Sequence, residues 1–399
     1  MEHIAVVGAS LAGLRAVETL RREGFGGRLT LVGGEPHLPY DRPPLSKELL
    51  AGSWQHEEIV LRKVPYDELD VELRLGVLAA ALDVGERTLT LADGTGLAWD
   101  GLVIATGATP RALPGVPTLE GLFTLRTIDD CLALRERLDA GPRVCVIGAG
   151  FMGAEVAATC RGRGLDVTVL EALPQPMVRG VGARLGEVLA DLHRDHGVDL
   201  RCGVTVETIE GDGRVEQVQL AGGATVACDV VLVAIGVTPC AGWLEGSGLT
   251  LDDGIVCDET LLAAPGVVAA GDVCRWPNPL FDGESMRIEH WTNAAEQGVA
   301  AAQRLLRSGD APAFAPVPFV WSDQYDVKIQ SAGRFSGDGH MEVVHGTLGE
   351  RRFVALFERT GRLSGVLAFS QPRRLMQYRR MIAERATFAD ALAFAAENG

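Results

Sequence analysis

The stretch Arg143–Glu171, RVCVIGAGFMGAEVAATCRGRGLDVTVLE, determines the fold. Its first five residues predict a buried strand, a glycine turn leads into a helix that ends near Arg163, and the last residues predict a second strand. Gly148, Gly150 and Gly153 form the pattern G-x-G-x-x-G, which permits a tight turn, close approach of backbone to a pyrophosphate, and close helix packing. This order predicts a dinucleotide-binding unit.

Glu171 closes the second strand, where a carboxylate can bind both hydroxyls of an adenosine ribose. A carboxylate at this place repels the additional phosphate of NADP, and the following ALPQPM contains no arginine to bind that phosphate. The sequence therefore favours NADH over NADPH. A glycine turn without a ligand is the alternative, and the strand and helix on either side make it the weaker one.

The same order of strand, turn, helix and strand opens the chain at residues 4–32. Its turn, GASLAG, has Gly8 and Gly13 in place but Ser10 at the middle position. A small side chain there still lets the backbone amides and the helix N-terminus face a phosphate. Glu35 is the candidate ribose ligand, and an exposed loop carboxylate is the alternative interpretation.

Ser10 also raises the hypothesis of a hydrolase, since a nucleophilic serine can stand at a strand-to-helix turn. The elbow pattern G-x-S-x-G needs a glycine where Ala12 stands, so the spacing argues against it. The duplicated nucleotide fold already accounts for the glycines.

The duplication extends beyond the two turns. Ala92–Pro110 aligns without gaps on Ala221–Pro239, with eight of nineteen positions identical, and each stretch follows one of the two units. Gly266–Cys274, GVVAAGDVC, is a further short strand that we expect to return to the first domain. We therefore expect two nucleotide-binding domains, the second inserted into the first.

From about Pro316 the pattern changes to short strands followed by helical sequence, which predicts a separate C-terminal domain. The expected strands are 319–321, 327–330, 353–357 and 363–368. The fold class is α/β, with one nucleotide-binding domain at 1–108 and 240–315, a second at 109–239 and a C-terminal α+β domain at 316–399.

Charge and cysteine content exclude several classes of protein. A net charge of −16 disfavours binding to nucleic acid or to anionic lipid, which need a positive surface. No apolar run approaches the roughly 20 residues of a membrane span, and no basic leader precedes the first strand, so we expect a cytoplasmic protein. Eight scattered cysteines without C-x-x-C indicate reduced thiols and no metal site.

His193 and His196 stand three residues apart on a predicted helix, so both imidazoles could share one face. No carboxylate or cysteine cluster with the spacing of a metal site accompanies them. A solvated helix face is therefore the favoured interpretation.

The chain resembles the FAD-dependent, NADH-oxidising ferredoxin reductases over nearly its whole length. Besides the two nucleotide turns, the resemblance lies in five motifs: PYDRPPLSK (Pro39–Lys47), ATG (Ala105–Gly107), AAGDV (Ala269–Val273), IEHWTNAAEQG (Ile288–Gly298) and WSDQYDVKIQ (Trp321–Gln330). The resemblance implies a fold like that of glutathione reductase, with two Rossmann-type domains and a C-terminal domain. It also implies that the domain at 1–108 and 240–315 binds FAD non-covalently and that the domain at 109–239 binds NADH.

By this resemblance, Gly8, Ser10, Gly13 and Glu35 hold the adenosine and pyrophosphate of FAD, Asp272 holds its ribityl chain, and Arg42, Lys47, Trp291 and Trp321 surround the flavin. The other residues implied are Thr106, Gly107, Arg126, Glu289 and His290 on the FAD side, and Gly148, Gly150, Met152, Gly153, Glu155, Glu171 and Gly236 on the NADH side.

The resemblance assigns the catalytic roles to Lys47, placed near flavin N5, and to Glu155, its partner beside the nicotinamide. A cation there favours the reduced, anionic flavin. From the residues alone, an exposed loop lysine and an ordinary helix carboxylate remain equal alternatives. Pro36–Leu50 contains no cysteine, so no thiol relay can be drawn and the flavin itself must pass electrons on.

A flavin that releases electrons singly matches a one-electron carrier such as a 2Fe-2S ferredoxin, serving a haem-thiolate monooxygenase or a ring-hydroxylating dioxygenase. Arg373, Arg374, Arg379 and Arg380 could form a local positive surface for an acidic ferredoxin, with a solvated helix face as the alternative. The rival functions are an NADH reductase of rubredoxin, quinone or oxygen, and an NADH-sensing flavoprotein like apoptosis-inducing factor.

Overall fold

The computed structural model describes residues 1–307, 309, 311–335 and 339–398. The chain forms two compact units, each assembled from three segments. Unit 1 comprises Met1–Asp41, Ile59–Thr109 and Thr238–Pro318, and unit 2 comprises Arg42–Glu58, Pro110–Val237 and Phe319–Gly399. The short strands β8 (Ala108–Pro110) and β17 (Val237–Pro239) lie where the chain passes from one unit to the other.

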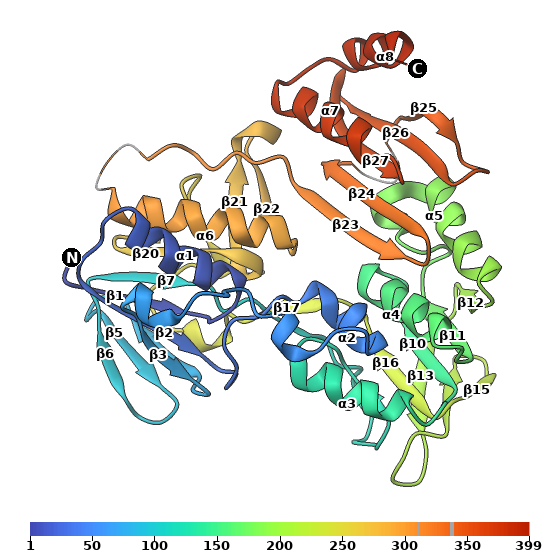
Figure 1. The fold of residues 1–399 in the computed structure, drawn as a ribbon, viewed down its shortest axis with the longest axis horizontal. Helices are drawn as coiled ribbons and strands as arrows, with labels where there is room; N and C mark the ends of the chain where they lie inside the picture. The colour runs from blue at the N-terminus through green and yellow to red at the C-terminus, as the bar shows by residue number, and fades with distance from the viewer. Residues whose placement is uncertain (308, 310, 336–338, 399) are drawn as a thin grey trace. The chain divides into compact units, whose positions relative to one another are not determined.

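Unit 1 is built on a sheet with the strand order β19-β20-β7-β1-β2-β3. The strands are β1 (His3–Val7), β2 (Arg28–Gly33), β3 (Glu72–Leu75), β7 (Gly101–Ile104), β19 (Leu262–Ala264) and β20 (Val267–Ala269). Helices α1 (Leu11–Arg22) and α6 (Trp291–Leu306) pack against each other beside β7 (Figure 1). β20 pairs in parallel with β7, so the late segment returns to the first sheet as its sequence predicted.

Two small sheets complete unit 1. One contains β4 (Ala79–Asp83), β5 (Thr88–Leu91) and β6 (Gly96–Ala98), and the other β18 (Ile255–Val256), β21 (Cys274–Asn278) and β22 (Glu284–Arg287). The strands β1 and β7 are almost entirely apolar and buried, because the parallel sheet is covered by other elements.

The first half of unit 2 repeats this design with the order β12-β11-β10-β16-β9. Its strands are β9 (Leu122–Phe123), β10 (Val144–Ile147), β11 (Val167–Glu171), β12 (Asp199–Cys202) and β16 (Val230–Val233), beside a sheet of β13 (Val206–Glu210), β14 (Gln217–Leu220) and β15 (Thr225–Ala227). The helices are α2 (Glu48–Ala51), α3 (Ile128–Leu138), α4 (Phe151–Gly162) and α5 (Val178–Asp195). The predicted strand, turn, helix and strand at 143–171 are present with shifts of one residue.

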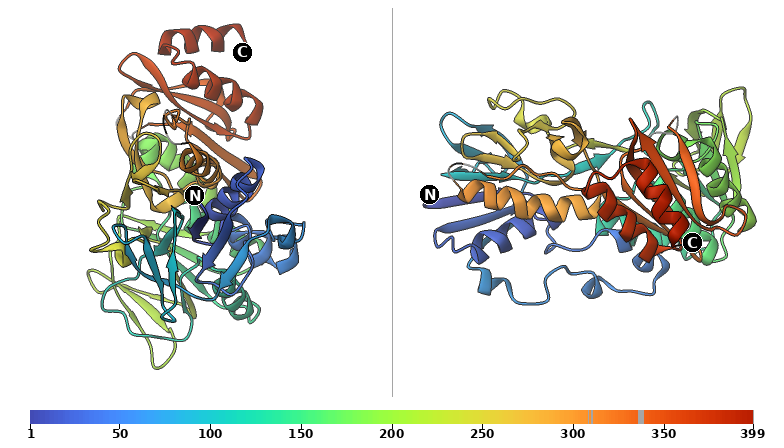
Figure 2. Two further views of the ribbon diagram at one scale, coloured as in Figure 1. Left: turned by 90° about the vertical axis from the view of Figure 1, so that its left-hand side faces the viewer. Right: turned by 90° about the horizontal axis from the view of Figure 1, so that it is seen from above.

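The rest of unit 2 is an antiparallel sheet with the order β23-β24-β27-β26-β25. Its strands are β23 (Phe319–Gln324), β24 (Val327–Gly333), β25 (Met341–Thr347), β26 (Arg352–Arg359) and β27 (Arg362–Phe369), followed by α7 (Pro372–Ala383) and α8 (Phe388–Glu397). Alternate residues of the sheet pack on α5, while α7 lies against β24 and β27 (Figures 1 and 2). Four of these strands were predicted, and β25 was missed.

Among the described residues, no helix has both the length and the hydropathy that crossing a membrane requires.

Candidate active site

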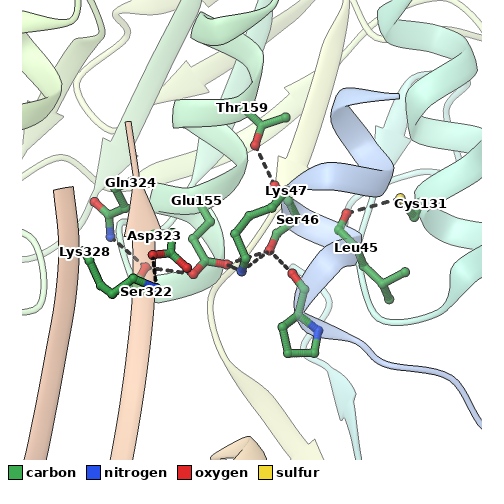
Figure 3. Close-up of polar contacts among 11 residues, drawn as sticks. Leu45, Ser46, Lys47, Cys131, Glu155, Thr159, Ser322, Asp323, Gln324 and Lys328 are labelled. Atoms are coloured by element: carbon green, nitrogen blue, oxygen red, sulfur yellow. Dashed lines mark hydrogen bonds and ion pairs between the residues drawn. The ribbon is translucent and has the colours of Figure 1, made fainter. Parts of the chain in front are cut away.

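Lys47 and Glu155 form a nearly buried ion pair in unit 2. The Lys47 Nζ lies 2.7 Å from the Glu155 Oε2, and the two side chains are 13% and 9% exposed (Figure 3). Lys47 immediately precedes α2, and Glu155 lies in the N-terminal half of α4. The pair that the resemblance singled out is thus held together across 108 positions of sequence.

Two serine hydroxyls complete the surroundings of the Glu155 carboxylate. Ser46 donates to Oε2 at 2.6 Å, and Ser322, on β23, donates to Oε1 at 2.8 Å (Figure 3). Both serines are buried. Neither was named from the sequence, although Ser46 lies within the motif PYDRPPLSK and Ser322 within WSDQYDVKIQ.

The segment 42–58 packs within unit 2, although the sequence assigned it to the FAD-binding domain. The reason is that four of its backbone carbonyls accept hydrogen bonds from side chains of α3, of α4 and of Arg163, the residue after α4. These bonds run from Cys131 to Leu45 (3.2 Å), Thr159 to Ser46 (2.7 Å), Arg135 to Leu49 (3.2 Å) and Arg163 to Leu50 (2.9 Å). Lys47 is therefore fixed to the unit that carries Glu155. The division into three functional domains stays a prediction.

The three glycines of the second turn are present for different physical reasons. Gly148 has φ +104°, and a Cβ there would lie 2.4 Å from the Ala234 oxygen; a Cβ at Gly153 would lie 2.0 Å from the Gly148 oxygen. Gly150 has an ordinary φ of −76°, and no atom within the described part of the chain comes within 4 Å of its ideal Cβ. The fold therefore requires Gly148 and Gly153, while the open space at Gly150, at the N-terminus of α4, fits the pyrophosphate of a dinucleotide.

Glu171 lies at the end of β11 beside this turn. Its Oε2 accepts from the Ala149 amide at 2.8 Å, and its Oε1 accepts from the Leu173 amide at 2.9 Å. Each oxygen keeps acceptor capacity for a ribose hydroxyl. Met152 is partly exposed on the first turn of α4, and Gly236, with φ +99°, follows β16. This arrangement fits NADH, with the turn holding the phosphates and Glu171 the ribose.

The first turn repeats the geometry in unit 1. A Cβ at Gly8 would lie 2.0 Å from the Ala105 oxygen, and one at Gly13 would lie 1.9 Å from the Gly8 oxygen. Ser10 has an extended backbone before α1, which explains why a side chain is accepted at the middle position. Glu35 follows β2 and accepts a hydrogen bond from the Tyr40 hydroxyl.

The N-terminal part of α6 presents polar atoms that suit the rest of FAD. Gln297 accepts from the Gly271 amide at 2.8 Å, which ties the helix to the residue before Asp272. The Gln297 Nε2 and the Asn293 Oδ1 are buried, and neither finds a hydrogen-bond partner among the described residues. Buried polar atoms of this kind call for a polar partner, so the residues present fit a bound flavin dinucleotide.

The remaining predicted residues fall in both units. In unit 1, Thr106, which precedes Gly107, donates to the Cys240 carbonyl at 2.8 Å, and Trp291 donates to Asp41 at 2.6 Å. Glu289 forms an ion pair with Arg287 at 2.7 Å, and His290 occupies the N-cap position of α6 without a side-chain capping bond. In unit 2, Arg42 donates to the Arg126 carbonyl, and Trp321 stacks on Phe319 with 6.1 Å between ring centroids. Four residues predicted on the FAD side, Arg42, Lys47, Arg126 and Trp321, thus belong to unit 2.

His193 and His196 do not form a solvated helix face, so that interpretation was wrong. His193 is buried, with its Nδ1 2.8 Å from the Tyr325 hydroxyl, and His196 stacks on the Tyr325 ring at 3.7 Å. The cause is the packing of α5 against the C-terminal sheet, which the sequence did not reveal. Both imidazoles pack on one tyrosine.

The burial of His193 is expected to make unit 2 less stable in acid. Burial lowers the pKa of His193 from about 6.5 to about 4, so the unfolded chain binds a proton in that window that the folded chain does not. Stability is therefore lost as pH falls from 6.5 to 4, by about 3 kcal/mol at about 1.4 kcal/mol per pKa unit. We expect the thermal midpoint to fall more steeply through this window than in His193→Gln; parallel curves would contradict this.

The four arginines of α7 differ in their surroundings. Arg373 and Arg380 are exposed, and Arg380 pairs with Glu384 at 2.8 Å. Arg379 lies 5.2 Å over the Phe319 ring, and Arg374 is half-buried near His345. These side chains therefore do not form one uniform solvated row.

Comparison with known proteins identifies the family. The pyridine nucleotide-disulphide oxidoreductase model matches residues 2–298, and the reductase C-terminal model matches 319–397. The chain is 38% identical to the ferredoxin reductase component of chlorobenzene dioxygenase from Cupriavidus sp. (strain PS12), over 98% of this chain and 94% of that protein. It is also 38% identical to rhodocoxin reductase from Rhodococcus erythropolis, over 95% and 89%.

A solved structure agrees with these matches. The covalent complex of putidaredoxin reductase with putidaredoxin contains a chain that matches with a TM-score of 0.92 and 32% identity, over 96% of this chain and 93% of that one. The predicted fold class and the use of FAD and NADH are thereby confirmed. The chain therefore belongs to the pyridine nucleotide-disulphide oxidoreductase family, among its ferredoxin reductases.

Proposed function

We propose that this chain oxidises NADH and passes the electrons singly to a small 2Fe-2S ferredoxin, which serves a haem-thiolate monooxygenase or a ring-hydroxylating dioxygenase in the cytoplasm. The balance is one NADH and two oxidised ferredoxins giving NAD, two reduced ferredoxins and one proton. FAD, when bound, supplies the step between a two-electron donor and a one-electron acceptor. The relatives reported above are ferredoxin reductases, so they favour neither the rival acceptors nor the NADH-sensing role.

The observation that carries this proposal is that Lys47, the ion-pair partner of Glu155, lies in a segment without a cysteine. Pro36–Leu50 contains no cysteine, and the first cysteine, Cys131, is buried. Burial raises the pKa of Cys131 to about 12, so its thiol stays protonated and is a poor nucleophile at neutral pH. A cation held near flavin N5 would instead stabilise the negative charge that a bound flavin gains when it accepts hydride from NADH.

A comparison of turnover rates with different electron acceptors distinguishes this proposal from its rivals. Purified protein with NADH should reduce a 2Fe-2S ferredoxin much faster than rubredoxin, a quinone or oxygen, when each is supplied at the same concentration. Slow turnover with every acceptor, together with dimerisation driven by NADH, would instead support the NADH-sensing alternative.

We propose that Glu171 sets the preference for NADH. Its two oxygens are fixed by the amides of Ala149 and Leu173, so the carboxylate cannot swing away from a 2′-phosphate. In Glu171→Gln the kcat/KM ratio of NADH to NADPH should fall by about tenfold, since like-charge repulsion is removed while a hydrogen-bond acceptor remains. An unchanged ratio would remove this role from Glu171.

We propose that the ferredoxin docks near Arg373, Arg374, Arg379 and Arg380. Arg373→Glu with Arg380→Glu should raise the KM for an acidic ferredoxin by about tenfold at low salt, and the difference should shrink as salt screens the charges. Arg194→Glu on α5, an exposed arginine paired with Glu187 at 2.8 Å, is the control for a charge reversal elsewhere in unit 2. Equal KM values in all variants would place the docking surface elsewhere.

A further inference from the structure

The Glu155 carboxylate is bound from the C-terminal sheet as well as from the segment that carries Lys47. Ser322 and Gln324 alternate along β23 and therefore point to the same face of the sheet, and both are fully buried. Ser322 donates to the Glu155 Oε1, while Lys47 and Ser46 donate to Oε2 (Figure 3). Each oxygen of the carboxylate is thus held by a different part of the chain.

Gln324 determines where the Ser322 hydroxyl points. The Gln324 Nε2 donates to the Ser322 Oγ at 3.1 Å, so the oxygen acts as acceptor there and its single hydrogen is left for Glu155. The Gln324 carboxamide also lies beside His193, where it opposes the lowering of the pKa of His193 by burial. Buried hydrogen bonds therefore connect Gln324 through Ser322 to Glu155.

These buried hydrogen bonds restrict the orientation of the Glu155 carboxylate. A hydrogen bond from a buried hydroxyl to an ionised oxygen is stronger than the same bond in water, because the surroundings screen it weakly. Because Ser322 holds Oε1, the Glu155 carboxylate cannot rotate, and Oε2 therefore stays directed at Lys47. Without Ser322, it would be anchored on one side only.

We infer that Ser322 is a positioning residue that holds the Glu155 carboxylate toward Lys47, and that Gln324 orients the Ser322 hydroxyl for this purpose. The inference rests on the proposed function, in which the pair assists hydride transfer from NADH. It gives the C-terminal domain a part in flavin reduction in addition to any role in binding a partner.

The test compares Ser322→Ala, Ser322→Thr and Ser322→Val by anaerobic stopped flow with NADH. Threonine and valine have nearly the same shape, but only threonine keeps the hydroxyl, so their difference isolates the hydrogen bond. The limiting rate of flavin reduction should be about tenfold lower in the alanine and valine variants than in the unaltered protein and Ser322→Thr. The NADH concentration that gives half the limiting rate should not change.

Ser364→Ala is the matched control, because Ser364 is buried in the same sheet and donates to the Phe357 carbonyl at 3.2 Å. Its rate should equal that of the unaltered protein. In a Glu155→Gln background, adding Ser322→Ala should change the rate by no more than about twofold, since the group that Ser322 positions is already altered.

The outcomes separate this inference from the proposed function. If Glu155→Gln is slowed but Ser322→Val reduces its flavin as fast as Ser322→Thr, this inference alone is overturned. If Glu155→Gln itself keeps the unaltered rate, the role of the pair and the inference both fail. Equal effects of Ser322→Ala in both backgrounds would show that Ser322 acts independently of Glu155 and would overturn the inference.

Discussion

Lys47→Ala is expected to slow the reduction of the bound flavin by NADH by about a hundredfold, the size of effect seen when one charge-stabilising group is removed from a preorganised site. The physical reason is the burial of the pair. The Lys47 ammonium lies 2.7 Å from the Glu155 carboxylate with both side chains nearly buried, so water cannot replace the lost cation well. Anaerobic stopped flow, which follows the flavin absorbance, measures this rate.

The controls address charge and stability. Lys328→Ala removes an exposed lysine that pairs with Asp323 at 2.9 Å on the same sheet as Ser322, and it should leave the rate unchanged. Because Lys47→Ala leaves a buried carboxylate without its cation, the double variant Lys47→Ala/Glu155→Gln should recover stability but not the rate. If the flavin of Lys47→Ala is reduced by NADH at the rate of the unaltered protein, Lys47 has no role in this step.

Gly150→Val is expected to weaken NADH binding by about a hundredfold, because charge-assisted hydrogen bonds between backbone amides and a pyrophosphate contribute about 1.5–3 kcal/mol each. A side chain at this position fills the space that the dinucleotide needs. It meets no described protein atom within 4 Å of its Cβ, so the fold should survive, apart from about 1 kcal/mol for the poorer cap of α4. Titration with NADH, with FAD content as the measure of folding, tests this.

The neighbouring glycine provides a contrast. Gly153→Ala would place its Cβ 2.0 Å from the Gly148 oxygen, so it should lower the thermal midpoint as well as NADH binding. Gly150→Ser should be milder than Gly150→Val, since Ser10 occupies the matching position of the first turn. If Gly150→Val binds NADH normally, the turn does not hold the pyrophosphate.

The nucleotide turns could be predicted because their signals are local. Gly8 and Gly148 have positive φ, and a Cβ at Gly13 or Gly153 would meet the carbonyl oxygen of the glycine five residues earlier, so these requirements leave a fixed spacing in the sequence. Strand β25 has no such signal. It lies at the sheet edge and is mostly half-buried or exposed, so MEVVHGT lacks the alternation that would predict a strand.

The site was only partly predictable, because its contacts join distant segments. Lys47 and Glu155 were assigned roles by resemblance, whereas Ser322 becomes informative only when the register of β23 places it against α4. His193 was misinterpreted for the same reason, since the helical spacing does not tell which element covers the helix. Local pattern decides the strands and turns, and tertiary packing decides which polar groups meet.

The most direct test of electron transfer from NADH through FAD is an anaerobic titration of the purified protein. We expect a yellow protein whose flavin absorbance is bleached by one equivalent of NADH and restored by two equivalents of oxidised 2Fe-2S ferredoxin. A colourless protein, or one that binds NADH without loss of flavin absorbance, would contradict it.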